Sequence, residues 1–188
     1  MDKSKEEEQT QQTQQTQQNS GNKPRLGITI GDVNGINFEL IFKTFQDERI
    51  LEFCTPVVYA SSRIANYHKK TLNYKNFNFN IIKSIDKAHP GKLNLINCWQ
   101  EEPRVELGHI KKESGPFAFR SLEACVEDLK QGFLEGIVTC PINKNAMQSE
   151  EFNFPGHTEY LQETFGGEDA LMLMTHELMR VGVVTGHI

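Results

Sequence analysis

Short apolar runs that alternate with amphipathic segments constrain the fold of this chain more than any other feature. Residues 26–30 read LGITI and residues 56–60 form a second β-branched run, so both are predicted to be buried strands. Between them, four apolar side chains recur at the spacing of one helical face: Phe38, Ile41, Phe42 and Phe45. Continuous apolar strands that alternate with such helices are typical of a parallel sheet covered on both faces.

The alternation continues to the end of the sequence. Further strands are predicted at residues 79–82, 93–98, 136–139, 170–174 and 181–185. One helix is expected to begin at Ser61 or Ser62. Another begins near Ser114 and carries an apolar stripe of Ala118, Leu122, Cys125, Val126, Leu129 and Phe133. We therefore predict an α/β fold of three layers, helix, sheet and helix, with a mostly parallel sheet.

The first 22 residues differ from the rest of the chain. They contain three consecutive glutamates at positions 6–8, repeated Gln-Gln-Thr, and no apolar residue after Met1. Such a segment cannot bury enough apolar surface to offset its chain entropy. We predict a disordered tail over residues 1–22 and one folded unit over residues 23–188.

Composition excludes several classes of protein. The net charge is −5 and basic residues do not cluster, which argues against a nucleic-acid-binding surface. No apolar run approaches the roughly 20 residues that cross a bilayer, and the acidic N-terminus is unlike a secretory signal. The four cysteines lack CxxC spacing, which favours reduced thiols over a zinc cluster. A cytoplasmic protein with neither nucleic-acid nor membrane partners is expected.

Three segments carry the candidate chemistry. Residues 31–36 (GDVNGI) follow the first strand, and residues 139–144 (TCPINK) end a later one. The third segment, residues 154–159 (FPGHTE), is followed by residues 183–188 (VVTGHI). The first segment lacks the G-x-G-x-x-G spacing of a dinucleotide-binding fingerprint, and alone it reads as a strand-to-helix turn.

The candidate side chains also have structural interpretations. Lys144 is either a surface residue or a cation in the ligand crevice. Thr158 could simply cap a helix beside an exposed His157, and His187 could be a core histidine. His68 and His109 show no partner spacing, and His176 follows a strand that could approach the site.

The order and spacing of these segments resemble those of the 4-hydroxythreonine-4-phosphate dehydrogenases of vitamin B6 synthesis, the PdxA family. The resemblance covers residues 25–188 and corresponds to about the first half of a typical member. It implies a fold like that of isocitrate and isopropylmalate dehydrogenases, here truncated. Val33 and Asn34 replace a more common proline and alanine, and Gly186 replaces a threonine, which indicates a divergent subfamily.

The resemblance also implies site residues. His157 and Thr158 are expected to bind the substrate, and His187 to coordinate a divalent cation such as zinc, magnesium or cobalt. The family's two other metal-binding histidines lie in its second half, which this sequence does not include. No catalytic residue and no NAD-contacting residue is assigned.

The activity implied by the resemblance is NAD-dependent oxidation of 4-phosphooxy-L-threonine, followed by loss of carbon dioxide. The product is 3-amino-2-oxopropyl phosphate, a precursor of pyridoxine 5'-phosphate. The cation would ease deprotonation of the alcohol, and the intact enzyme would be a homodimer. Because the sequence stops at Ile188, the chain by itself is expected to be inactive or nearly so. Two alternatives stay open: a dehydrogenase for another phosphorylated four-carbon hydroxy acid, and a truncated module that only binds or dimerises.

Overall fold

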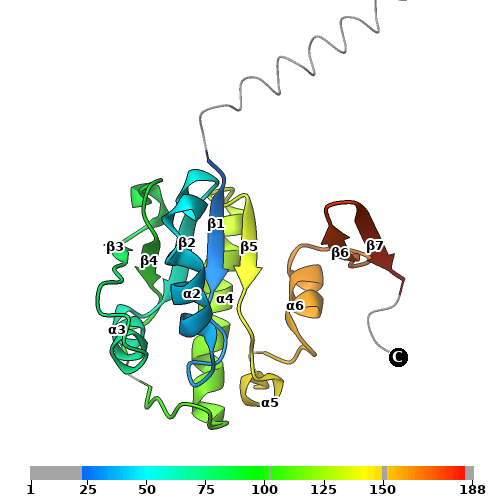
Figure 1. Cartoon of the computed structure of the whole chain (residues 1–188). Helices are drawn as coiled ribbons and strands as arrows, with labels where there is room; N and C mark the ends of the chain where they lie inside the picture. The colour runs from blue at the N-terminus through cyan, green and yellow to red at the C-terminus, as the bar shows by residue number, and fades with distance from the viewer. Residues whose placement is uncertain (1–22, 102, 150–151, 185–188) are drawn as a thin grey trace, which may run out of the picture.

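The structure is a computed structural model that describes residues 23–101, 103–149 and 152–184. The described chain forms a five-stranded sheet with helices on both faces and a separate two-stranded hairpin (Figure 1). The tail predicted at residues 1–22 lies outside the described residues. No helix in the described ranges is long and apolar enough to span a membrane.

The five-stranded sheet is entirely parallel, with the strand order β3-β4-β2-β1-β5. Its strands are β1 (Arg25–Thr29), β2 (Thr55–Ala60), β3 (Asn80–Ile82), β4 (Asn94–Asn97) and β5 (Gly136–Thr139). All five lie where the apolar runs predict strands. β2 is therefore the central strand, and β1 lies between β2 and the edge strand β5.

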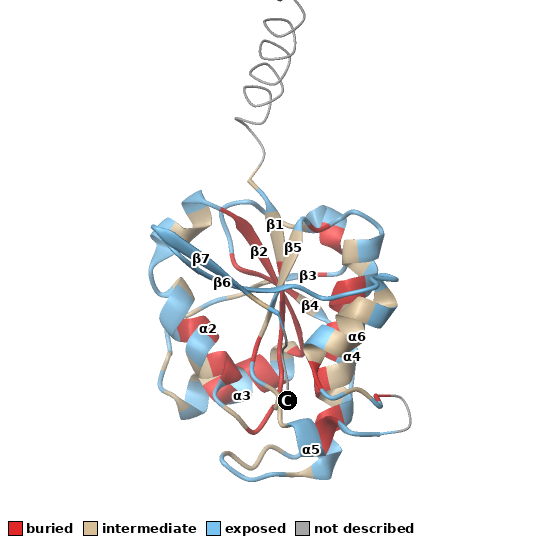
Figure 2. Cartoon of the chain, turned by 90° about the vertical axis from the view of Figure 1, so that its right-hand side faces the viewer, coloured by how far each residue is buried: buried red, intermediate tan, exposed pale blue. Residues whose placement is uncertain are grey.

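Helices cover both faces of this sheet, which confirms the three-layer prediction. α2 (Asn37–Phe45) and α3 (Ser62–Thr71) cover one face, and α4 (Gly115–Lys130) covers the other (Figure 1). The alternation along β2 separates the two cores, because Val58 packs towards α2 and α3 whereas Val57 packs towards α4. Figure 2 shows the buried residues concentrated where these layers meet.

The apolar stripe of α2 packs as its spacing predicts. Phe38, Ile41 and Phe42 are buried, and Phe45 is half-buried against the same core. The Phe42 ring lies 4.9 Å from the rings of both Tyr74 and Phe77, measured between centroids. Burying each of these large side chains contributes about 1.5–3 kcal/mol, so this layer is a main source of stability.

Short helices and the hairpin complete the chain. The 3-10 turns are η1 (Glu48–Glu52), η2 (Ile85–Lys87) and η3 (Lys112–Ser114). After β5 come α5 (Lys144–Met147), α6 (His157–Thr164), β6 (Met172–His176) and β7 (Met179–Val183).

The hairpin differs from the prediction in the positions of its strands and in their pairing. β6 and β7 lie about two residues from the predicted positions, and they pair antiparallel with each other instead of joining the parallel sheet. Only residues 177 and 178 connect them. A parallel crossover needs about a dozen residues or more, so this connection permits only a hairpin.

All four cysteines are free thiols. Cys54, Cys125 and Cys140 are buried, and Cys98 is half-buried. Burial raises the pKa of Cys98 to about 12 and that of Cys140 to about 11. Both groups are therefore protonated and weakly nucleophilic at neutral pH.

The loops that follow β1 and β5 touch so closely that one of them requires a glycine. A Cβ on Gly31 would lie 1.9 Å from the carbonyl oxygen of Pro141. We predict that Gly31→Ala lowers the free energy of unfolding by about 1–3 kcal/mol, the usual effect of overpacking, as measured by urea titration. Gly91→Ala is the matched control, because its nearest atoms are 3.7 Å away on the His89 ring. Equal losses in the two variants would contradict the close contact.

Candidate functional site

The sheet brings the first two candidate segments together. β1 and β5 are neighbours, with Thr29 opposite Thr139, so the segments leave the sheet side by side. The backbone N–H of Asp32 donates to the carbonyl of Pro141 at 3.2 Å. This is the carboxyl edge of a parallel sheet, the edge where ligands bind in open α/β folds.

The segment at residues 31–36 is a rigid loop. The Asp32 side chain accepts a hydrogen bond from the N–H of Asn34 at 3.0 Å. The Asp32 carbonyl accepts from the N–H of Gly35 at 2.9 Å and from the side-chain amide of Asn37 at 2.5 Å. The loop is therefore held by its own hydrogen bonds before any ligand arrives.

His68 supports this loop from α3, a role that the sequence analysis missed. Its Nε2 lies 2.8 Å from the carbonyl oxygen of Val33, so Nε2 carries the proton and donates. The ring is buried and packs on Phe38 at 4.9 Å between centroids. Burial lowers the pKa of His68. His68 follows the buried Ile64 by four residues, so both lie on the apolar face of α3. This spacing could have predicted that His68 is buried.

The second segment places an exposed cation, Lys144, at the beginning of α5, five residues after the end of β5. The side-chain oxygen of Asn143 accepts from the N–H of Ala146 at 3.0 Å and so caps α5. Lys144 is the first residue of that helix, and its side chain extends to Gly156. The Lys144 Nζ lies 3.8 Å from the position that a Cβ on Gly156 would take.

An aromatic cluster holds the third segment in place. Tyr160 of α6 packs on Phe119 of α4 and on Phe152 and Phe154, with ring centroids 5.4–5.8 Å apart. Because His157 lies one helical turn before Tyr160, this cluster also fixes the beginning of α6. α6 therefore presents its N-terminus beside Lys144.

The first turn of α6 contains both predicted substrate-binding residues. His157 is half-buried, and burial together with the nearby charge of Lys144 lowers its pKa. The imidazole is therefore neutral at pH 7. Thr158 is exposed, and the cap residue Gly156 has no side chain to bond the first-turn N–H groups.

These groups make a corner suited to an anion. The Lys144 ammonium group lies near Gly156, the cap of α6, and the imidazole of His157 and the hydroxyl of Thr158 follow in the first turn of that helix. Helix N-termini favour phosphate and carboxylate groups. Glu159 adds one negative charge to the same corner, since its Oε2 lies 3.4 Å from the Gly156 Cβ position.

The structure leaves the predicted metal ligand untested. His187 lies outside the described residues, so its role stays a prediction. Among the described residues, no three His, Cys, Asp or Glu side chains are grouped so that they could hold a metal ion. His176 belongs to the exposed hairpin, opposite Met179.

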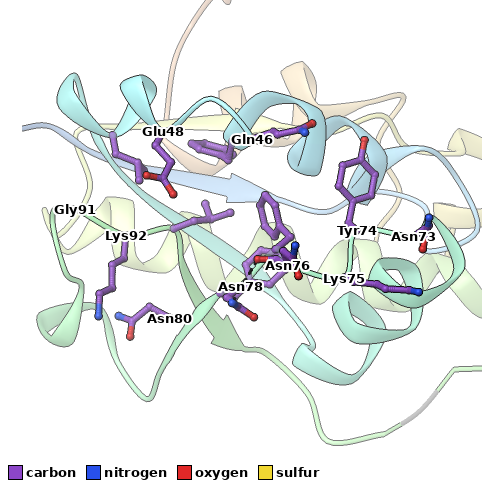
Figure 3. Close-up of a pocket in the computed structure, with 15 residues that line it drawn as sticks. Gln46, Glu48, Asn73, Tyr74, Lys75, Asn76, Asn78, Asn80, Gly91 and Lys92 are labelled. Atoms are coloured by element: carbon purple, nitrogen blue, oxygen red, sulfur yellow. Dashed lines mark hydrogen bonds between the residues drawn. The ribbon is translucent and has the colours of Figure 1, made fainter.

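A cleft of about 790 Å³ lies elsewhere, towards the amino ends of β3 and β4 (Figure 3). It lies between the end of α2, η1 and the segment before β3, and its lining includes Phe45, Glu48, Tyr74, Phe79 and Lys92. The candidate site lies at the opposite, carboxyl edge of the sheet. The two are therefore separate places on the molecule.

Comparison with known proteins identifies the family. The family model described as "Pyridoxal phosphate biosynthetic protein PdxA" matches residues 52–188. This chain belongs to the PdxA family. The match includes the second and third candidate segments, and it confirms the resemblance to this family.

Relatives of this PdxA chain agree with the assignment. It is 45% identical over 168 residues to a 4-hydroxythreonine-4-phosphate dehydrogenase of Bacteroides thetaiotaomicron, covering 89% of the chain and 46% of the relative. It is 33% identical over 175 residues to a Clostridium botulinum protein provisionally named a D-threonate 4-phosphate dehydrogenase, covering 89% and 51%.

A solved structure also matches the PdxA chain. The crystal structure of a 4-hydroxythreonine-4-phosphate dehydrogenase from Burkholderia phymatum superposes with a TM-score of 0.79 at 25% identity, covering 88% of this chain and 51% of that one. The chain thus spans about half the length of the relatives that it matches.

The contact between Lys144 and α6 predicts a change in titration. Removing the ammonium group in Lys144→Met should raise the pKa of His157, because a nearby positive charge disfavours the imidazolium form. The pKa is measured from the imidazole NMR shifts across pH. Lys130→Met, at the far end of α4, is the control and should leave the His157 curve unchanged. An unshifted curve in Lys144→Met would show that the two groups lie apart.

Because His68 is buried, we predict that the free energy of unfolding falls in acid. Its folded pKa is below the ordinary value of 6.5, so the unfolded state binds the proton more readily. Its contribution to stability is therefore present above pH 6.5 and is lost as the pH falls below that value. His68→Gln keeps a donor for Val33 and does not titrate. It should lose less unfolding free energy between pH 7 and pH 5 than the wild type or the exposed His109→Gln control, each measured by urea titration. Equal acid losses in all three proteins would refute this role.

Proposed function

We propose that the intact protein is an NAD-dependent oxidoreductase that oxidises and decarboxylates 4-phosphooxy-L-threonine to 3-amino-2-oxopropyl phosphate in vitamin B6 synthesis. The observation that carries this proposal is the 45% identity to a 4-hydroxythreonine-4-phosphate dehydrogenase over nearly the whole chain. The family description, a pyridoxal phosphate biosynthetic protein, supports the pathway.

The described residues suit the binding of this substrate. The substrate carries a phosphate and a carboxylate, and the N-terminus of α6 with Lys144 offers positive potential to such groups. In the proposal, neutral His157 and the Thr158 hydroxyl form hydrogen bonds with the substrate. A neutral imidazole can donate at one nitrogen and accept at the other, which lets it orient an alcohol as well as an anion.

We also propose two cofactors and an oligomeric state for the intact enzyme. The intact enzyme would use NAD and a divalent cation, zinc, magnesium or cobalt, with His187 as one ligand, and would act as a cytoplasmic homodimer. The described residues alone do not supply a metal site. NAD-contacting residues are not assigned in this chain.

A second candidate substrate has a specific observation in its favour. The C. botulinum relative, 33% identical, is provisionally named for D-threonate 4-phosphate. That compound shares the phosphate and carboxylate but has a hydroxyl group where 4-phosphooxy-L-threonine has an amine. The corner formed by Lys144 and the N-terminus of α6 suits both substrates. The preference between them therefore depends on how the enzyme contacts the carbon that carries the amine or the hydroxyl group. The higher identity to the B. thetaiotaomicron relative favours the amine.

Turnover by the intact gene product tests the assignment. NADH formation should be at least tenfold more efficient, in kcat/KM, with 4-phosphooxy-L-threonine than with D-threonate 4-phosphate. His157→Ala should lower kcat/KM by about tenfold to a hundredfold, the effect of losing one hydrogen bond to a charged substrate. His109→Ala, on an exposed loop, should leave it unchanged. The 188-residue chain alone is predicted to give little or no turnover.

The contradicting outcomes are distinct. Faster turnover of D-threonate 4-phosphate would favour the second candidate. No NADH with either substrate would overturn the proposed activity. Robust turnover by the 188-residue chain alone would overturn the expectation that this half is inactive.

A further inference from the structure

The cleft at the amino edge of the sheet has no role in the proposed activity, yet it has the size of a ligand site. Its volume is about 790 Å³, within the roughly 300–1,000 Å³ of small-molecule sites. Four segments line it: the end of α2, η1, residues 73–80 and residues 91–93. Figure 3 shows Glu48 and Lys92 towards one end of the cleft and Tyr74 towards the other.

Aromatic rings form much of the apolar part of the cleft. The rings that line it are half-buried and belong to Phe45, Tyr74, Phe77 and Phe79. Phe42 of the core holds two of them in place, because its ring centroid lies 4.9 Å from those of Tyr74 and Phe77. Aromatic rings prefer offset-stacked or edge-to-face contacts with other rings. The cleft therefore favours a ligand that contains a flat ring.

Polar side chains at the rim are available to a ligand. Lys75 and Lys92 are exposed, and within the described residues neither ammonium group forms an ion pair or a hydrogen bond. The side-chain amides of Asn73 and Asn76 are exposed and unbonded in the same way. Each amide can donate and accept, so the rim can bind a ring that has both kinds of polar group along its edge.

The charge of the lining favours an anion. Two lysines and one glutamate, Glu48, give the lining a charge of +1, although the whole chain carries −5. An ammonium group binds phosphate as a point charge. The Glu48 carboxylate can accept a hydrogen bond from an N–H group of a ring. A ligand with one phosphate group and a polar ring edge therefore matches both charges.

The cleft is formed before any ligand arrives, because its central segment is held by backbone hydrogen bonds. Asn73 follows α3 in the left-handed conformation, with φ of 62°, and turns the chain towards the cleft. The N–H of Tyr74 donates to the Lys69 carbonyl at 2.9 Å, and the N–H of Asn80 donates to the Leu93 carbonyl at 2.9 Å. A preformed site lowers the entropy cost of binding.

We propose that this cleft binds a heteroaromatic ring that carries one phosphate group, as in a nucleoside monophosphate or a phosphorylated pyridine. The ring lies against the aromatic side chains, the amides of Asn73 and Asn76 bond its polar edge, and Lys75 or Lys92 binds the phosphate. A nucleic-acid strand fits less well, because two lysines do not make the basic groove that follows a strand. The cleft is separate from the candidate active site, so the two proposals stand or fall independently.

Calorimetric titration of the 188-residue chain tests the proposal. AMP and pyridoxine 5'-phosphate represent the two sources of a ring phosphate, and adenosine and ribose 5-phosphate each lack one of the two groups. We expect AMP or pyridoxine 5'-phosphate to bind at least fivefold more tightly than both adenosine and ribose 5-phosphate. The tighter of the two ring phosphates identifies the source. NMR shifts of backbone amides should change in residues 73–80 and 91–93 and stay unchanged in residues 156–160.

Variants of the two lysines test the phosphate contact. Lys75→Met and Lys92→Met together should weaken binding at least tenfold. Lys83→Met is the matched control, because Lys83 is also exposed but lies outside the lining. Lys144→Met should leave binding unchanged, since Lys144 belongs to the candidate active site.

A variant of one aromatic residue tests the ring contact. Tyr74→Leu keeps an apolar side chain but removes the ring, and it should weaken binding at least fivefold. Tyr67→Leu is the control, because Tyr67 is an exposed tyrosine of α3 outside the lining. Circular dichroism checks folding, and the lysine variants test the site even if Tyr74→Leu does not fold.

Four results would overturn the proposal. One is the absence of binding by both ring phosphates. Another is equally tight binding of ribose 5-phosphate, which would show a site for an anion alone. The third is a shift of amides in residues 156–160 with loss of binding in Lys144→Met, which would place the ligand in the candidate active site. The fourth is at least tenfold tighter binding of an eight-nucleotide single strand than of AMP, which would favour a nucleic-acid strand. None of these results depends on turnover, so the proposed activity keeps its own assay.

Discussion

The rest of the structure depends on the backbone contact between the loops that follow β1 and β5. Gly31 leaves no room for a side chain against the Pro141 carbonyl, and Asp32 donates a hydrogen bond to that same oxygen. Because this contact fixes the direction in which the chain leaves β5, it also determines where α5 and α6 begin. His68 buttresses the first loop from the opposite side through Val33. The site residues are therefore positioned mainly by packed backbone, and only secondarily by bonds between their own side chains.

The electrostatics of the corner follow from the same packing. The cluster of aromatic rings under α6 brings the helix N-terminus next to Lys144, and the ammonium group together with burial keeps His157 neutral. The Lys144 ammonium group and the neutral His157 imidazole, which can donate a hydrogen bond, both favour anionic ligands. Because the imidazole stays neutral, the charge of this corner does not change near pH 7. The corner thus has the properties of a binding surface. Within the described residues, no three His, Cys, Asp or Glu side chains are grouped as a metal site would need.

Much of the fold could be predicted from the sequence, because buried parallel strands have a strong local signal. β5 was predicted at its observed bounds, and α4 begins one residue after Ser114. The pairing of β6 with β7 could not be predicted, since hydrophobic periodicity does not identify a partner and residues 177–178 lack a typical hairpin-turn sequence. The proximity of Lys144 to Gly156 could not be predicted from the sequence either, because it depends on packing between distant segments. The assignments of His157 and Thr158 came from the family resemblance, and their functional roles, like that of His187, stay predictions.

The most direct measurement of the central claim is a crystal structure of the intact protein with 4-phosphooxy-L-threonine bound. We predict that the substrate lies at the carboxyl edge of the sheet, within hydrogen-bonding distance of His157 and Thr158, with Lys144 facing its phosphate or carboxylate. Substrate bound instead in the cleft beside Tyr74 and Lys92, at the other edge of the sheet, would contradict this placement.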